Sequence, residues 1–356
     1  MRNLLACRLD SQRISRTDFS APADAVRWMG AIQAQDYPGA KWSVGLRLPG
    51  TTDRGVEQAL ADRSIVRTWS LRGTLHLMAA EDVRWVQELI YPRMQTQFRF
   101  NLKRHALENG ELSRCYDILG KLLRDGVQAT RDEVREALAQ GGITVHNERV
   151  NFILVAAAAE GLICQGVRRN KDFTFTLLDE WIGPTPKRSR DEALHAFALR
   201  YFRSHGPATV ADFAWWSGLT LTEARKAVEL VRPELQEETH NGQTVWLAPE
   251  TEEPAENTLF LLPGFDEYLL GYTDRTDALP PKYEKEVNGT GNGLFVSTIV
   301  VNGKVEGTWR RAFRKDTAVI EITPFETFSA AKQKRIERLG GVWAQYAGMK
   351  AVEFVR

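Results

Sequence analysis

Two glutamine side chains, Gln33 and Gln35, stand two residues apart in the segment Ile32-Gln-Ala-Gln-Asp36. Carboxamides do not titrate, but they can hold a water molecule and face a developing positive charge. In a regular helix, residues two apart diverge by about 200°, so the two amides would not share a target. We therefore expect a helix from Ala23 to about residue 34, broken by Tyr37-Pro38-Gly39, with both glutamines on its last turn. A frayed or extended last turn could point both amides one way, whereas spacing alone favours solvent-facing amides.

The carboxylate of Asp36 directly follows the two glutamines and is a stronger base than an amide. It is therefore the rival candidate for activating a water molecule. The alternative is an acid of the turn before Tyr37-Pro38.

Carboxylates also gather near residue 270, where Asp266, Glu267 and Asp274 fall within nine residues. Their spacing fits no known metal-binding loop, and no histidine accompanies them. We interpret them as hydrogen-bonding anchors of an irregular loop, with Arg275 as their partner. The three cysteines are far apart and support neither a disulfide framework nor a zinc site. The sequence therefore predicts no metal site.

Cationic side chains concentrate at three places where phosphates could bind. They are Arg67, Arg72 and His76 in a strand-like segment, Arg168, Arg169 and Lys171 at a predicted wing tip, and Lys304 and Arg310 on a predicted hairpin. In a regular strand Arg67 would lie on one face and Arg72 and His76 on the other, so at most one set faces a ligand without a bulge. Structural alternatives are a salt bridge for Arg72, a core histidine at position 76, a solvated turn and a charge-protected edge strand.

Length and composition narrow the class of protein. With 356 residues the chain exceeds what one core usually serves, and 43% hydrophobic with 26% charged residues is typical of soluble globular proteins. No apolar run approaches the roughly 18 residues of a membrane span. The start of the chain has charges where a signal peptide needs apolar residues, so we expect a cytoplasmic protein with no membrane partner. A net charge of +1 means that any affinity for nucleic acid requires a local basic groove.

An internal repeat organises the middle of the chain. Ala-Thr recurs at Thr130 and Thr209, each followed three residues later by an acid, which predicts two helix N-caps. Each cap lies in a series of three predicted helices followed by a two-stranded hairpin, the winged-helix plan. The helical segments that flank the caps are 113–124, 147–159, 191–203 and 220–231, and the hairpins are 162–178 and 235–248. Residues 23–34, 55–65 and 68–78 suggest a third unit less cleanly.

The last hundred residues have a different pattern. They predict a strand at 259–262, a loop at 263–268, a hairpin with its turn at Asn302-Gly303, a strand at 317–323 and a helix at 329–338 stopped by Gly340-Gly341. The predicted fold class is α+β, with three tandem winged-helix units before a small C-terminal α+β domain. The predicted domains are 1–112 with flanking helices, 113–184, 185–252 and 253–356.

Four segments together resemble one family, the bacterial tandem winged-helix proteins that include AlkZ-type alkylpurine DNA glycosylases. The segments are Ile32-Gln-Ala-Gln-Asp36, Arg67-Thr-Trp-Ser-Leu-Arg-Gly-Thr-Leu-His76, Leu261-Leu-Pro-Gly-Phe-Asp-Glu-Tyr-Leu-Leu-Gly-Tyr-Thr-Asp-Arg275 and Gly307-Thr-Trp-Arg310. The resemblance implies three winged helices around a DNA-sized concavity, with Gln33 and Gln35 as the catalytic motif. Some relatives carry an acid where this chain has Gln35, so the AlkZ type is favoured and Asp36 takes a supporting part.

The resemblance implies a monofunctional DNA glycosylase that hydrolyses the N-glycosidic bond of N7-alkylated or bulky purine adducts, including interstrand crosslinks, in DNA repair or self-resistance. It would do so without a metal or an organic cofactor. Its partner would be double-stranded DNA with alkylated purines, and it would act as a monomer. The alternative is a non-enzymatic winged-helix DNA-binding protein, a regulator or an architectural protein, because many relatives are known only as DNA-binding. A small-molecule hydrolase lacks support, since the chain has no Gly-x-Ser-x-Gly segment.

Overall fold

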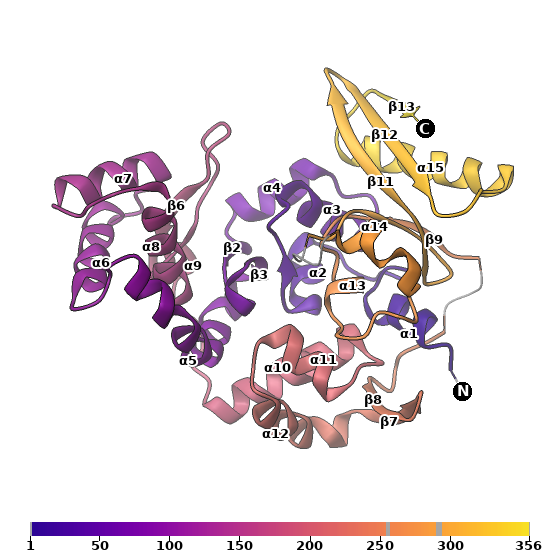
Figure 1. The fold of residues 1–356 in the computed structure, drawn as a ribbon, viewed down its shortest axis with the longest axis horizontal. Helices are drawn as coiled ribbons and strands as arrows, with labels where there is room; N and C mark the ends of the chain where they lie inside the picture. The colour runs from indigo at the N-terminus through magenta and orange to yellow at the C-terminus, as the bar shows by residue number, and fades with distance from the viewer. Residues whose placement is uncertain (1, 254–256, 290–293, 356) are drawn as a thin grey trace.

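The computed structural model describes residues 2–253, 257–289 and 294–355. Its elements follow an arc, with the helices of residues 111–182 at one end and the strands of residues 304–355 at the other (Figure 1). The N-terminal elements lie between these ends. None of the helices within these ranges is both long and apolar enough to cross a bilayer.

The N-terminal region departs from its predicted elements. It contains α1 (Leu4–Ser11), α2 (Pro22–Met29), β1 (Ile32–Gln33), α3 (Tyr37–Arg47), α4 (Asp53–Ala61), β2 (Ile65–Trp69), β3 (Leu75–Ala79) and α5 (Ala80–Arg104). The helix predicted to reach residue 34 ends at Met29, because Gly30 adopts φ +78°. The segment predicted as one strand, 68–78, is a hairpin of β2 and β3 around the short 3-10 turn η1 (Leu71–Gly73).

The two repeated helical regions follow their prediction closely. They contain α6 (Glu111–Leu122), β4 (Ala129–Thr130), α7 (Arg131–Gln140), α8 (Asn147–Ala159), β5 (Ile163–Gln165), β6 (Thr174–Leu177), α9 (Leu178–Ile182), α10 (Arg190–His205), α11 (Val210–Ser217), α12 (Leu221–Val231), β7 (Gln236–His240) and β8 (Gln243–Leu247). Thr130 and Thr209 both form capping boxes with the acid three residues on. The predicted hairpins are confirmed as the pairs β5–β6 and β7–β8.

One sheet joins the first two regions. Its strand order is β1-β3-β2-β5-β6-β4, and the pairing of Arg67 with Gln165 connects β2 to β5. The N-terminal hairpin and the wing of the second region therefore form a continuous surface. The division of the chain into three winged-helix units and four domains remains a prediction.

The C-terminal region is a sheet covered by a helix. It contains β9 (Leu259–Leu262), α13 (Glu267–Leu270), α14 (Glu284–Asn288), β10 (Thr298–Val301), β11 (Lys304–Arg314), β12 (Thr317–Pro324), α15 (Ala330–Tyr346) and β13 (Ala351–Val355), in the strand order β13-β12-β11-β10-β9. The helix stop predicted at Gly340-Gly341 is wrong, because α15 continues to Tyr346. Gly340 instead allows close packing, since a Cβ there would come within 2.6 Å of the Phe354 ring.

The predicted turn at Asn302-Gly303 is confirmed between β10 and β11. This turn does not protrude, because Gly303 lies against Leu5 and the Tyr268 hydroxyl. The hairpin that projects from the molecule is formed by β11 and β12 (Figure 1).

The C-terminal region fixes α3, the helix that follows the two glutamines. Trp42 of α3 lies in a core cluster with Trp343 and Tyr346 of α15. The Trp42 indole donates to the carbonyl of Leu261 at 2.8 Å, and the Tyr346 hydroxyl donates to the carbonyl of Lys41 at 2.7 Å. The middle of α3 is therefore held by packing on a separate part of the chain.

Candidate active site

The backbone that carries the two glutamines is extended. Gln33 pairs with His76 across β1 and β3, and the N–H of Ala34 donates to the carbonyl of Leu75 at 2.7 Å. In an extended chain, residues two apart lie on the same side. Accordingly, Gln33 Nε2 donates to Gln35 Oε1 at 2.8 Å. The prediction that the pair lies on the last turn of a helix is wrong, but the expected outcome, two amides on one side, is observed.

The two amides differ in exposure. Gln33 is 7% exposed, whereas Gln35 is exposed at the start of the loop into α3. Because the Gln33 amide donates to the Gln35 oxygen, the Gln35 amide group retains its own N–H donors for a ligand. The pair therefore acts as a preorganised hydrogen-bonding unit with a buried member and an accessible member.

Arg67 anchors the residue between the glutamines. It is 4% exposed, and its Nε and Nη2 donate to the carbonyl of Ala34 at 3.1 and 2.7 Å. Its Nη1 donates to Gln165 Oε1, and its guanidinium lies 4.3 Å from the Phe173 ring centroid. Burial lowers the pKa of Arg67 to about 10, so the group remains charged at neutral pH. Arg67 therefore lies on the buried side of the segment of residues 33–36, which we call the glutamine loop.

Arg72 lies beside Gln33, in the turn of the β2–β3 hairpin. It adopts φ +54°, and its Nη1 donates to the carbonyl of Trp216. Its Nη2 lies 3.5 Å from Gln33 Oε1. Burial lowers the pKa of Arg72. Arg72 therefore contacts Gln33, and both Nη atoms of its guanidinium have acceptors within the protein.

His76 is fully buried next to Gln33 in the sheet. Its Nδ1 lies 3.0 Å from the carbonyl of Thr74. Burial, together with the charge of Arg72, lowers the pKa of His76 to about 4, so the imidazole is neutral at neutral pH. A neutral side chain with no exposed surface cannot meet a phosphate in this conformation.

Asp36 occupies the N-cap position of α3, but its side chain accepts no capping hydrogen bond. Its two carboxylate oxygens instead accept bonds from Nη2 of Arg311, at 2.9 and 2.6 Å. Arg311 comes from β11, so this ion pair joins the glutamine loop to the projecting hairpin. Both carboxylate oxygens are thus occupied by a cation from another element, which favours a supporting part for Asp36.

The remaining cations are spread over the surface. Arg168 lies over the rings of Tyr37 and Phe173, at 5.4 and 5.1 Å, and Arg169 pairs with Glu133 at 2.7 Å. Lys171 at the wing tip and Lys304 and Arg310 on β11 are exposed, as Arg169 is, but these three form no ion pair with a residue in the described ranges. The structure thus gathers Arg67 and Arg168 around the rings of Tyr37 and Phe173 and leaves the others apart.

Sequence reasoning gave Glu267 only the role of a loop anchor and gave Arg311 no role, although both contact the segment of the two glutamines. Glu267 accepts the N–H of Gln33 at 2.9 Å, across a separation of 234 residues. The predicted partnership of Arg275 with the nearby acids is wrong, because its Nε donates to the carbonyl of Leu269. The expected anchoring role of the acids is observed, with Arg47 as the partner of Asp266 at 2.9 and 3.0 Å.

No group of three or more His, Cys, Asp or Glu side chains is arranged to hold a metal ion in the part of the chain that the structure describes.

Comparison with known proteins places this geometry in a family. The model of the family described as DNA glycosylase AlkZ-like matches residues 26–346. A curated protein of Streptomyces sahachiroi, named interstrand DNA cross-link repair glycosylase, is 27% identical over an alignment 371 residues long, covering 98% of this chain and 96% of that protein. The solved structure of Streptomyces sahachiroi DNA glycosylase AlkZ superposes with a TM-score of 0.81 and 25% identity, covering 100% of both chains. The chain therefore belongs to the AlkZ-like DNA glycosylase family.

Proposed function

We propose that this protein is a monofunctional DNA glycosylase that hydrolyses the N-glycosidic bond of N7-alkylated or bulky purine adducts. The observation that carries the proposal is the hydrogen bond of 2.8 Å between Gln33 Nε2 and Gln35 Oε1, which turns two isolated amides into one oriented unit. The curated relative is named for interstrand cross-link repair. We extend the proposed substrates to purines whose adduct joins both strands.

The chemistry of N7-alkylated purines suits neutral catalytic groups. The alkylated base is already cationic, so its bond to C1′ is weakened and no strong general acid is needed. Departure of the base leaves an oxocarbenium-like sugar, and water then adds to C1′ and loses a proton to solvent. Catalysis requires a positioned water and dipoles that face the developing sugar cation, both of which carboxamides provide.

The proposed roles follow the exposure of each group. Gln35, the exposed amide, orients the attacking water, and Gln33 fixes Gln35 from behind. Asp36 lies beside the pair and stabilises positive charge on the sugar through its own charge, moderated by Arg311. In this scheme Asp36 does not accept a proton in the rate-limiting step.

Binding to duplex DNA is proposed to rest on the exposed cations. Lys171, Lys304 and Arg310 carry no ion pair with the described residues and are the most available for phosphates, with Arg168 and Arg169 in part. We propose that the protein acts as a monomer and that three winged-helix units line the DNA.

The test is incubation with duplex DNA that carries N7-methylguanine at one position, followed by alkaline cleavage of abasic sites. The wild-type protein should produce a break at that position, and Gln33→Ala should be much slower on the same DNA. Binding without any excision, for wild-type protein on both N7-methylguanine and crosslinked DNA, would contradict the proposal and leave a non-enzymatic DNA-binding protein.

A further inference from the structure

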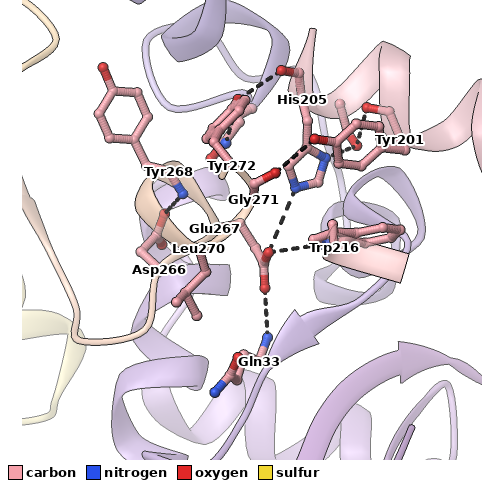
Figure 2. A network of polar contacts seen from close by, with 12 residues as sticks. Gln33, Tyr201, His205, Trp216, Asp266, Glu267, Tyr268, Leu270, Gly271 and Tyr272 are labelled. Atoms are coloured by element: carbon pink, nitrogen blue, oxygen red, sulfur yellow. Dashed lines mark hydrogen bonds and ion pairs between the residues drawn. The ribbon is translucent and has the colours of Figure 1, made fainter. Parts of the chain in front are cut away.

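A buried carboxylate lies directly behind the Gln33 backbone. β1 is the edge strand of its sheet, and the N–H of Ala34 points towards β3. The N–H of Gln33 therefore points away from the sheet, where an edge strand normally has no partner. It donates to Oε1 of Glu267 at 2.9 Å (Figure 2). The Glu267 carboxylate thus accepts the hydrogen bond that a neighbouring strand would otherwise accept. It does so at Gln33, the residue whose side chain donates to Gln35.

The surroundings of Glu267 keep it charged and fixed. The residue is fully buried, and its Oε2 accepts the indole N–H of Trp216 at 3.0 Å. His205 Nε2 faces the same oxygen at 3.7 Å (Figure 2). Burial alone raises the pKa of Glu267, but the facing His205 and the N–H of Gln33 outweigh burial and hold that pKa below its ordinary value. A buried carboxylate is costly unless donors surround it, and here the donors come from Gln33 and Trp216, with His205 facing the carboxylate.

Glu267 lies in the short helix α13, where the residues on either side of it have partners of their own. Asp266, one residue earlier, binds Arg47 and caps α13 by accepting the N–H of Tyr268 at 3.0 Å. The Tyr268 hydroxyl donates to the carbonyl of Gly303 at 2.6 Å, on the side of the C-terminal sheet. Consecutive residues thus anchor α13 to three different parts of the chain, and among them Glu267 is the one bonded to the glutamine strand.

We propose that Glu267 is a positioning residue for base excision, which holds the Gln33 strand from its open edge and so keeps the Gln33 amide in contact with Gln35. This inference rests on the proposed function. Glu267 itself is fully buried and acts through Gln33, without contact with DNA. Its carboxylate joins the C-terminal region to the strand that carries Gln33.

The test compares Glu267→Gln with Tyr268→Phe. Glu267→Gln keeps the shape of the side chain but loses its charge and one acceptor, whereas Tyr268→Phe removes one buried hydrogen bond from the same helix on the side away from Gln33. Single-turnover excision by Glu267→Gln should be slower by about 10- to 100-fold, with DNA affinity unchanged within about twofold. Tyr268→Phe should show a similar loss of thermal stability with the wild-type excision rate.

A double-mutant cycle with Gln33→Ala separates positioning from a general structural effect. If Glu267 acts through the Gln33 side chain, Glu267→Gln should cause no further loss of rate in the Gln33→Ala background. Equal losses in both backgrounds would overturn the inference and leave the proposed function intact. Gln33→Ala at the wild-type rate would overturn the proposed function as well.

A second variant covers the case in which Glu267→Gln does not fold. Trp216→Phe retains an aromatic ring in the core and the carboxylate, but removes one donor to Oε2. It should slow excision by about three- to tenfold, and this loss should also vanish in the Gln33→Ala background. A loss that persists in that background would contradict the inference.

Discussion

Arg67→Met separates an internal anchor from a phosphate contact, because the two roles predict different measurements. The substitution removes both donors to the Ala34 carbonyl and the donor to Gln165, while it keeps a long side chain next to Phe173. Two buried acceptors lose their partner. At about 1–3 kcal/mol for each unsatisfied group, the free energy of unfolding should fall by about 4 kcal/mol.

The rate of excision should also fall in Arg67→Met, because the Ala34 carbonyl loses the side chain that anchors it. Ala34 lies between the two catalytic candidates, and a displacement of about 1 Å at such a site costs on the order of 100-fold in rate. We expect a loss of about 10- to 100-fold in single-turnover excision on N7-methylguanine duplexes. The dependence of DNA affinity on salt should stay at the wild-type slope, since Arg67 is 4% exposed and turned inward.

The matched control is Gln165→Leu. It removes the other partner of Arg67 but leaves both bonds to Ala34, so stability should fall while the rate stays within about threefold of wild type. The reasoning would be refuted if Arg67→Met excised at the wild-type rate while its salt slope fell by about 0.9, the value expected for one lost phosphate contact.

Three further predictions concern charge. The pKa of His76 is about 4 in the folded protein and 6.5 in the unfolded chain, so between these pH values only the unfolded chain binds the proton. The free energy of unfolding should therefore fall by about 3 kcal/mol as the pH falls from 7 to 4. Urea titrations of His76→Asn should lack this loss, and an equal loss would contradict the assignment. Asp36→Asn should cost less than Gln35→Ala, with a nearly level rate between about pH 6 and 8; a larger loss for Asp36→Asn would make Asp36 the general base. Affinity for duplex DNA should fall with salt at a log-log slope of about −3 to −6, and this slope should be less steep by about 0.9 in Arg310→Gln and in Lys171→Gln. An affinity that does not change with salt would exclude phosphate binding.

Local signals in the sequence predicted much of the helical scaffold. All the groups of the Thr130 and Thr209 caps lie within four consecutive residues. In each cap the threonine hydroxyl accepts the backbone N–H of the acid, and the acid accepts the backbone N–H of the threonine. The turn at Asn302-Gly303 is equally local, because both residues adopt positive φ there. Such elements could be placed to within a few residues.

The predictions failed where distant contacts decide the outcome. Gln33 lies in a strand because β3 offers it a partner, which the apolar run from Ala23 onward does not reveal. Gly340 continues a helix because that helix packs on Phe354, although glycine usually ends one. Tertiary packing overrides local propensity in both cases.

The candidate site was predictable in its residue types and only partly in its geometry. The segment of Gln33 and Gln35 was identified by resemblance, whereas their extended backbone follows from sheet pairing. Arg311 and Glu267 come from segments far along the chain, so their bonds to the glutamine loop leave no spacing pattern. Arg67 was expected to face a ligand, and a buried carbonyl proved to be its partner.

The central claim is that Gln33 and Gln35 work as one unit in hydrolysis. The most direct measurement is the single-turnover excision rate of Gln33→Ala, Gln35→Ala and the double variant on duplex DNA with N7-methylguanine. Each single variant should lose about 10- to 1000-fold with little change in DNA affinity, and the double variant should lose only slightly more than the worse single, because each amide depends on the other. Wild-type rates in both single variants, or a double loss equal to the product of the single losses, would contradict the claim.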